Sequence, residues 1–302
     1  MGQAPIVIAV YVTLTLALGG QWIAAKLGLN AVPPLELSAM RYLIASVALL
    51  VACAVTRTPL PWHRWRLIGA GALCGVVGFN TLAFVGLSLT PASDSALIIP
   101  TTIPVATAVF ATFLGDRLTG RKLAGFAVAT AGAALIIAGG QQGGDGASEQ
   151  RLRGDLLEVG SAVSWAASLT IGAIVLRTER VLGYVTLLVL MGAALLLPLG
   201  ALPQGYADVP SWTAPTWIAA MSLGLFSTAV AFVLFSWAVR RFGPGPAAMV
   251  TYFTPITALA LAFVILGERP LPLQLLGGLV VVIGVRLAAR RAGPRAREAV
   301  VA

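Results

Sequence analysis

In the stretch Ala83-Phe84-Val85-Gly86-Leu87-Ser88, four of the six residues recur 148 positions further along the chain, as Ala231-Phe232-Val233 and Ser236. Each copy lies within a long apolar run, and a helix of about 20 such residues can cross a bilayer. The recurrence indicates that the chain consists of two related halves, each built from membrane helices.

Further matches between the halves follow in the same order, and the spacing between the copies rises to 152 residues. Pro104 recurs as Pro255, Gly115-Asp116-Arg117 as Gly267-Glu268-Arg269, and Gly125 and Gly132 as Gly277 and Gly284. Apolar sequences resemble one another by chance, but an ordered series with polar, Gly and Pro members favours duplication.

The composition is that of an integral membrane protein. The 302 residues are 58% hydrophobic and 10% charged, with a mean hydropathy of +0.92. Soluble domains carry about 25% charged residues. Cys53 and Cys74 fall inside apolar runs, and His63 is the one histidine, so the sequence predicts no metal site and no cofactor.

Hydropathy predicts an all-α membrane protein with ten transmembrane helices. The predicted spans are 5–25, 35–56, 66–89, 92–115, 121–139, 154–176, 182–202, 213–238, 245–266 and 273–291. The first five-helix repeat is expected over 1–140, a polar linker over 141–153, the second repeat over 154–291 and a basic tail over 292–302.

The positive charges predict the orientation of these spans. Fifteen of the 20 Lys and Arg residues lie in the tail and in the loops after the second, fourth, sixth and eighth spans, and four lie on the opposite side. The positive-inside rule then puts both termini in the cytoplasm. It also accounts for the net charge of +9 without nucleic acid as a partner. Because five is odd, two tandem five-helix copies must insert with opposite orientations.

Several short motifs follow one another in a specific order. They are Gly19-Gly20-Gln21-Trp22, Val32-Pro33-Pro34, Arg41-Tyr42, Gly115-Asp116-Arg117 and, in the second half, Ser164-Trp165-Ala166 and Tyr252-Phe253-Thr254-Pro255. In these motifs the chain resembles the EamA family of the drug/metabolite transporter superfamily over nearly its whole length. The resemblance implies a ten-helix transporter with a central cavity. Leu18-Gly19 stands where the family often has Trp-Gly, and this leaves the shape and polarity of the cavity open.

Polar and aromatic residues at mid-depth are the candidates for a substrate cavity, because polar groups inside a membrane face protein or water. In the family the helices that carry them line the central cavity. The candidates are Gln21, Trp22, Asn80, Thr81, Phe84, Thr101, Thr102, Trp165, Ser168, Thr228, Phe232, Tyr252 and Thr254. For any single hydroxyl, a bond to its own helix backbone is an alternative.

Acidic residues and prolines suggest two further roles. Asp94 and Glu158 are candidates for a proton or ammonium site, with capping of a helix N-terminus as the alternative. Pro100, Pro104 and Pro255 are candidate hinges, since each removes a backbone donor within a span.

The sequence thus predicts a secondary transporter that exports amino acids or similar small metabolites across a bacterial inner membrane by alternating access. One alternative is an exporter of drugs or lipophilic cations. Another is a receptor or enzyme without transport, although no catalytic constellation is present in the sequence and no enzyme is expected. The expected partners are a small-molecule substrate and the bilayer, and the chain is expected to be a monomer or a homodimer.

Overall fold

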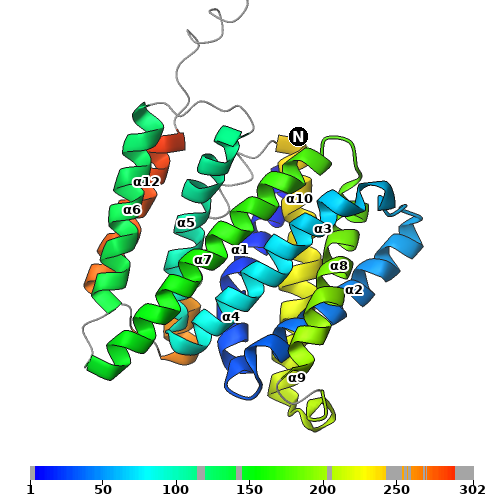
Figure 1. Ribbon diagram of the computed structural model, residues 1–302, viewed down its shortest axis with the longest axis horizontal. Helices are drawn as coiled ribbons and strands as arrows, with labels where there is room; N and C mark the ends of the chain where they lie inside the picture. Colours follow the sequence, from blue (N-terminus) through cyan, green and yellow to red (C-terminus); the bar gives the residue numbers. More distant parts are fainter. Residues whose placement is uncertain are drawn as a thin grey trace, which may run out of the picture.

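The computed structural model describes residues 4–113, 120–140, 145–202, 206–242, 254, 257, 260–267, 269 and 271–289. These residues form helices joined by short connections (Figure 1). The long helices are α1 (Ala4–Leu29), α2 (Pro34–Thr56), α5 (Ala92–Phe113), α6 (Gly120–Gly140), α7 (Asp145–Val175), α8 (Val181–Ala201) and α12 (Pro272–Ala289).

Two further spans are each made of three consecutive segments. The first consists of α3 (Trp65–Ala72), the π-helical η2 (Leu73–Gly78) and α4 (Phe79–Leu89). The second consists of α9 (Ala214–Ser222), the π-helical η4 (Leu223–Val230) and α10 (Ala231–Phe242). These spans are the third helix of each predicted half, so the wide turns occupy similar positions in both. π-Turns are rare in proteins as a whole, and those that do occur often lie at functional sites.

The structure supports a membrane protein that is nearly all helical. Six helical segments of the described chain are long and apolar enough to cross a bilayer. Nine of the ten predicted spans coincide with helical segments of the described chain. The predicted span 245–266 falls largely outside the described residues, which include its last turn as η5 (Ala262–Leu266). The count of ten spans and the inverted repeat therefore stay predictions.

Helix α7 begins earlier than the sequence predicts, because residues 145–153 of the expected linker are helical. Two ion pairs hold these polar turns. Arg153 pairs with Glu149 at 2.6 Å, one turn away, and Arg151 reaches α5 to pair with Asp94. The rest of the linker and the basic tail 292–302 lie outside the described residues.

The helices pack closely where small residues allow it. Ser168 of α7 donates a hydrogen bond to the Gly71 carbonyl at 2.8 Å, and a Cβ at Gly75 would clash with the same Ser168. Helix α6 lies beside α12 (Figure 1), and both members of each predicted glycine pair on these helices are buried. Close approach of membrane helices at small residues is the expected pattern.

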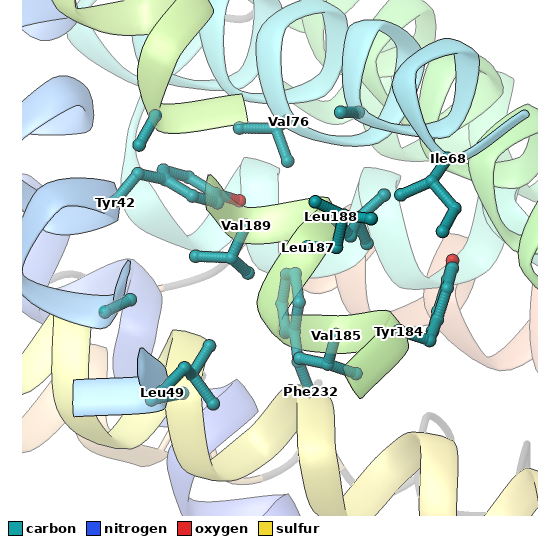
Figure 2. Packing of buried hydrophobic residues seen from close by; sticks show 14 of the residues in the cluster. Tyr42, Leu49, Ile68, Val76, Tyr184, Val185, Leu187, Leu188, Val189 and Phe232 are labelled. Atoms are coloured by element: carbon teal, nitrogen blue, oxygen red, sulfur yellow. The ribbon is translucent and has the colours of Figure 1, made fainter. Parts of the chain in front are cut away.

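Helices α2 and α8 pack against each other beside η2, and their contact forms one of the apolar clusters of the molecule. Figure 2 shows Tyr42 and Leu49 of α2 facing Val185 and Val189 of α8, with Phe232 of α10 close by. Residues from both predicted halves therefore share one core.

The backbone conformation explains the glycine in the second copy of the Gly-acid-Arg turn. Gly267 has a φ of +69°, in the left-handed region that a side chain disfavours. Gly115 and the two acidic residues of the turns, Asp116 and Glu268, lie outside the described residues.

Candidate functional site

A buried arginine lies at the centre of the candidate site. Arg41 is in the second turn of α2, and only 1% of its surface is exposed. Its Nε donates to Thr228 Oγ1 of η4 at 2.5 Å, while Nη1 faces Asn80 Oδ1 of α4 at 3.4 Å. Its Nη2 faces Gln21 Oε1 of α1 at 3.4 Å and the Ser227 carbonyl of η4 at 3.5 Å. One guanidinium thus connects four helical segments from both halves of the chain.

The acceptors around Arg41 are held by their own hydrogen bonds. Asn80 Nδ2 donates to the Tyr42 hydroxyl at 2.8 Å and to the Val76 carbonyl at 2.9 Å, which leaves Oδ1 turned toward Arg41. Thr228 donates to the Leu223 carbonyl, five residues earlier, at 2.9 Å. A carbonyl five residues back is the acceptor that a π-turn provides, so the wide turn of η4 orients the Thr228 hydroxyl.

The charge of Arg41 is surrounded by neutral groups. Arginine stays protonated in proteins. In the part of the chain that the structure describes, no carboxylate forms an ion pair with Arg41. The rings of Tyr42 and Phe84 lie 5.5 and 5.8 Å from its guanidinium carbon, close enough for cation–π attraction. The centre of the site is therefore positive and is lined by amides, hydroxyls and aromatic faces.

An aromatic group lies next to this polar centre. The Trp165 ring of α7 is 5.0 Å from the Phe79 ring and 5.1 Å from the Phe232 ring, both tilted. Phe79 precedes Asn80 in α4, and Phe232 follows Thr228 by four residues, so it lies one turn away on the same face. Trp165 therefore joins the two halves through aromatic contacts, as Arg41 does through hydrogen bonds.

The structure brings six of the predicted cavity residues together: Gln21, Asn80, Phe84, Trp165, Thr228 and Phe232. Trp22 and Thr81 are neighbours of this set in sequence. Their Nε1 and Oγ1 atoms are buried and have no hydrogen-bond partner among the described residues. Ser168 instead forms the helix contact with Gly71.

The remaining predicted residues are placed only in part. Thr102 is half-buried in α5, Thr254 is buried, and Pro100 is buried within α5. Tyr252 and Pro255 lie outside the described residues, as do the side chains of Thr101 and Pro104.

A second polar centre contains three buried carboxyl groups: Asp94 of α5 and Asp155 and Glu158 of α7. Arg151 binds Asp94 through two hydrogen bonds of 2.7 and 2.9 Å. The Thr90 hydroxyl lies 3.0 Å from Asp94 Oδ2 and 2.9 Å from Asp155 Oδ1, and Ser95 donates to Glu158 at 2.5 Å. The second oxygens of Asp155 and Glu158 have no hydrogen-bond partner among the described residues.

Lys26 joins α1 to the end of α4, next to this carboxyl cluster. Its Nζ donates to the carbonyls of Leu87 and Thr90 at 2.8 and 2.7 Å. These carbonyls are at the C-terminal end of α4, where a helix leaves acceptors without intrahelical donors. Gly86 of α4 lies against Glu158, and Asn80 is six residues earlier in the same helix. Six helical residues rise about 9 Å, so the two polar centres are neighbours along α4.

Sequence reasoning missed Arg41 as a site residue, because a charged group near the start of a span reads as interfacial. The signal that could have found it is its position seven residues inside the apolar run, since a charge at such depth has a functional reason by default. Asp155 was missed for the same reason, and Arg151 because it fell in the predicted linker.

The fold and the polar centres define a helical membrane protein whose two halves meet at a buried positive charge. The model of the EamA-like transporter family matches residues 5–138 and again residues 152–290. The chain therefore belongs to this family, as the sequence resemblance indicated.

Similar proteins agree with this assignment, and one solved structure shares the fold. A probable terminal-alkyne amino-acid exporter of Streptantibioticus cattleyicolor is 34% identical over 288 residues, covering 91% of each chain. An uncharacterized transporter of Archaeoglobus fulgidus is 28% identical, covering 89% of this chain and 92% of its own. An uncharacterized inner membrane transporter of Escherichia coli is 25% identical, covering 89% and 86%. A chain of known crystal structure has the same fold, with a TM-score of 0.67 at 22% identity over 96% of this chain and 97% of that chain.

Proposed function

We propose that this protein is a secondary transporter that exports an amino acid or a similar small metabolite across a bacterial inner membrane by alternating access. The observation that carries the proposal is the Arg41 centre, whose partners come from α1, α4 and η4 and so from both halves. A polar site between two halves near the middle of the membrane is where secondary transporters bind substrate. The relative from Streptantibioticus cattleyicolor supports the substrate class.

The architecture belongs to the proposal as well. Ten spans in two inverted five-helix repeats, with both termini in the cytoplasm, are supported by the two family matches and by the charge asymmetry of the loops. The similar places of η2 and η4 in their halves also support the repeat. Pro100, Pro104 and Pro255 remain the proposed hinges.

The carboxyl cluster is proposed to hold the coupling proton, with Asp155 added to the predicted Asp94 and Glu158. A hydroxyl carries one proton, so Thr90 donates to Asp94 or to Asp155 but not fully to both. A proton on Asp155 allows both contacts. Asp94 is the weaker candidate, because Arg151 already binds both of its carboxylate oxygens through hydrogen bonds.

Counterflow in proteoliposomes tests the transport proposal. Vesicles loaded with one unlabelled amino acid at a time are diluted into the same labelled amino acid, and L-propargylglycine is included because it is a terminal-alkyne amino acid. For at least one compound, the vesicles are expected to accumulate more label than vesicles that contain no protein. Flux of a cationic dye such as ethidium with no amino-acid flux would replace the substrate class, and no flux of any compound would favour the receptor or enzyme alternatives.

A further inference from the structure

The guanidinium nitrogens of Arg41 form hydrogen bonds of unequal length. Its Nε bond to Thr228 is short, at 2.5 Å, and fixes the plane of the guanidinium. The three contacts of the terminal nitrogens are 3.4, 3.4 and 3.5 Å long, beyond the usual range of about 2.7–3.2 Å. The terminal fork is therefore held in place by weak bonds that a stronger acceptor can replace.

The positive charge of Arg41 also favours an acceptor that carries a negative charge. A guanidinium buried in a membrane protein is costly and is normally paired. Among the described residues its partners are amide, hydroxyl and carbonyl oxygens, and the nearby rings of Tyr42 and Phe84 compensate only part of the charge. The four carboxyl groups buried in the described part of the chain belong to Glu36, Asp94, Asp155 and Glu158, and none of them forms an ion pair with Arg41.

We infer that the terminal nitrogens of Arg41 bind the carboxylate of the transported molecule, so that the substrates are monocarboxylates such as amino acids. A planar carboxylate fits the guanidinium fork through two parallel hydrogen bonds. One negative charge on the substrate balances the one positive charge of the centre, whereas a phosphate brings a larger charge into it. A lipophilic cation would meet a like charge. The inference rests on the proposed transport function and narrows its substrate class.

The test compares a carboxylate with its neutralised form in the wild-type protein. L-Propargylglycine, its carboxamide and inorganic phosphate are each added to purified protein at constant ionic strength, and the apparent unfolding temperature is followed. The same compounds are then tested as competitors of amino-acid counterflow. The carboxamide is expected to act at least about 10-fold more weakly than the acid, because the charge-assisted pair is lost.

Variants of Arg41 test whether the preference for the acid over the carboxamide depends on this residue. Arg41→Gln should remove the preference for the acid, Arg41→Lys should keep part of it through the charge, and Arg153→Gln, an exposed arginine of α7, should behave as wild type. Equal action of acid and carboxamide on wild type, or stronger action of phosphate, overturns the assignment while leaving transport intact. An undiminished acid preference in folded Arg41→Gln also overturns it. Absence of both flux and stabilisation by every amino acid refutes the proposed function itself. If Arg41→Gln does not fold, the wild-type comparison of acid and carboxamide still decides.

Discussion

Two arginines of α7 that are two residues apart should differ sharply in what they contribute to stability. Arg151 binds Asp94 through two hydrogen bonds, and the Asp94 side chain is 1% exposed. Arg153 pairs with Glu149 at 2.6 Å, but the two side chains are 71% and 68% exposed. The variants Arg151→Gln and Arg153→Gln change the same chemistry in two different surroundings.

The expected magnitudes follow from burial. Removing one partner of a buried ion pair costs about 3–5 kcal/mol, and the Thr90 hydroxyl still faces Asp94 after the change, so about 3 kcal/mol is expected for Arg151→Gln. An exposed pair one helical turn apart contributes about 0.5 kcal/mol. The two variants should therefore differ by about 2.5 kcal/mol, which is roughly 70-fold in an unfolding equilibrium constant.

Thermal unfolding of the purified protein in detergent, followed by loss of the monodisperse peak in size-exclusion chromatography, measures the difference. Arg151→Gln should lower the apparent midpoint by about 5 °C or more, and Arg153→Gln by about 1 °C. The double variant Arg151→Gln with Asp94→Asn should recover most of the loss, because the buried charge is removed with its partner. Equal midpoints for the two single variants, or no recovery in the double variant, would refute the assignment of a buried ion pair.

Three further results are expected. Trp165→Ala should lower counterflow about 10-fold at unchanged expression, whereas Trp165→Phe keeps an aromatic ring between Phe79 and Phe232 and should keep most of the flux. Wild-type flux in Trp165→Ala would contradict the place of Trp165 in the site. Gly75→Val should destabilise the contact of η2 with α7 by about 2 kcal/mol or more in the same thermal assay, because the new side chain collides with Ser168, while Gly120→Ala meets no atom within 4 Å and should have little effect. Gly267→Ala should cost about 1 kcal/mol through its φ of +69° alone, since a Cβ there also meets nothing within 4 Å; a midpoint equal to that of wild type would show that the turn tolerates a side chain.

The sequence was sufficient to predict where the helices lie, because about 20 apolar residues between polar breaks leave few alternatives. Span 35–56 was predicted and Pro34–Thr56 is observed, and span 182–202 corresponds to Val181–Ala201. Hydropathy predicts the start of helix α7 too late, because its first turns are polar. Their stability comes from Asp94 in another helix, which hydropathy does not detect. The π-turns in η2 and η4 were not anticipated either, since they leave the apolar pattern intact.

The candidate site was predicted less well than the helices. Depth and polarity predict Gln21, Asn80, Phe84 and Thr228 as cavity residues. The structure gathers these four around Arg41, which the same criteria do not predict. Arg41 and Thr228 are 187 residues apart, and a single sequence contains no signal for such a contact. Similar hydroxyls, such as Ser168, form packing contacts that sequence cannot distinguish from a binding role.

The single charge of Arg41 has a consequence for the two halves as separate chains. Helix α2 carries Arg41, whereas α8, its counterpart in the predicted second repeat, has no charged residue from Val181 to Ala201. Two identical copies of the first half, paired as the two halves of this chain are, would bring two guanidinium groups into the same centre, where they repel each other at low dielectric. The two different halves of one chain avoid this repulsion, because α8 brings no second charge. Residues 1–140 expressed alone should therefore not form a stable symmetric dimer.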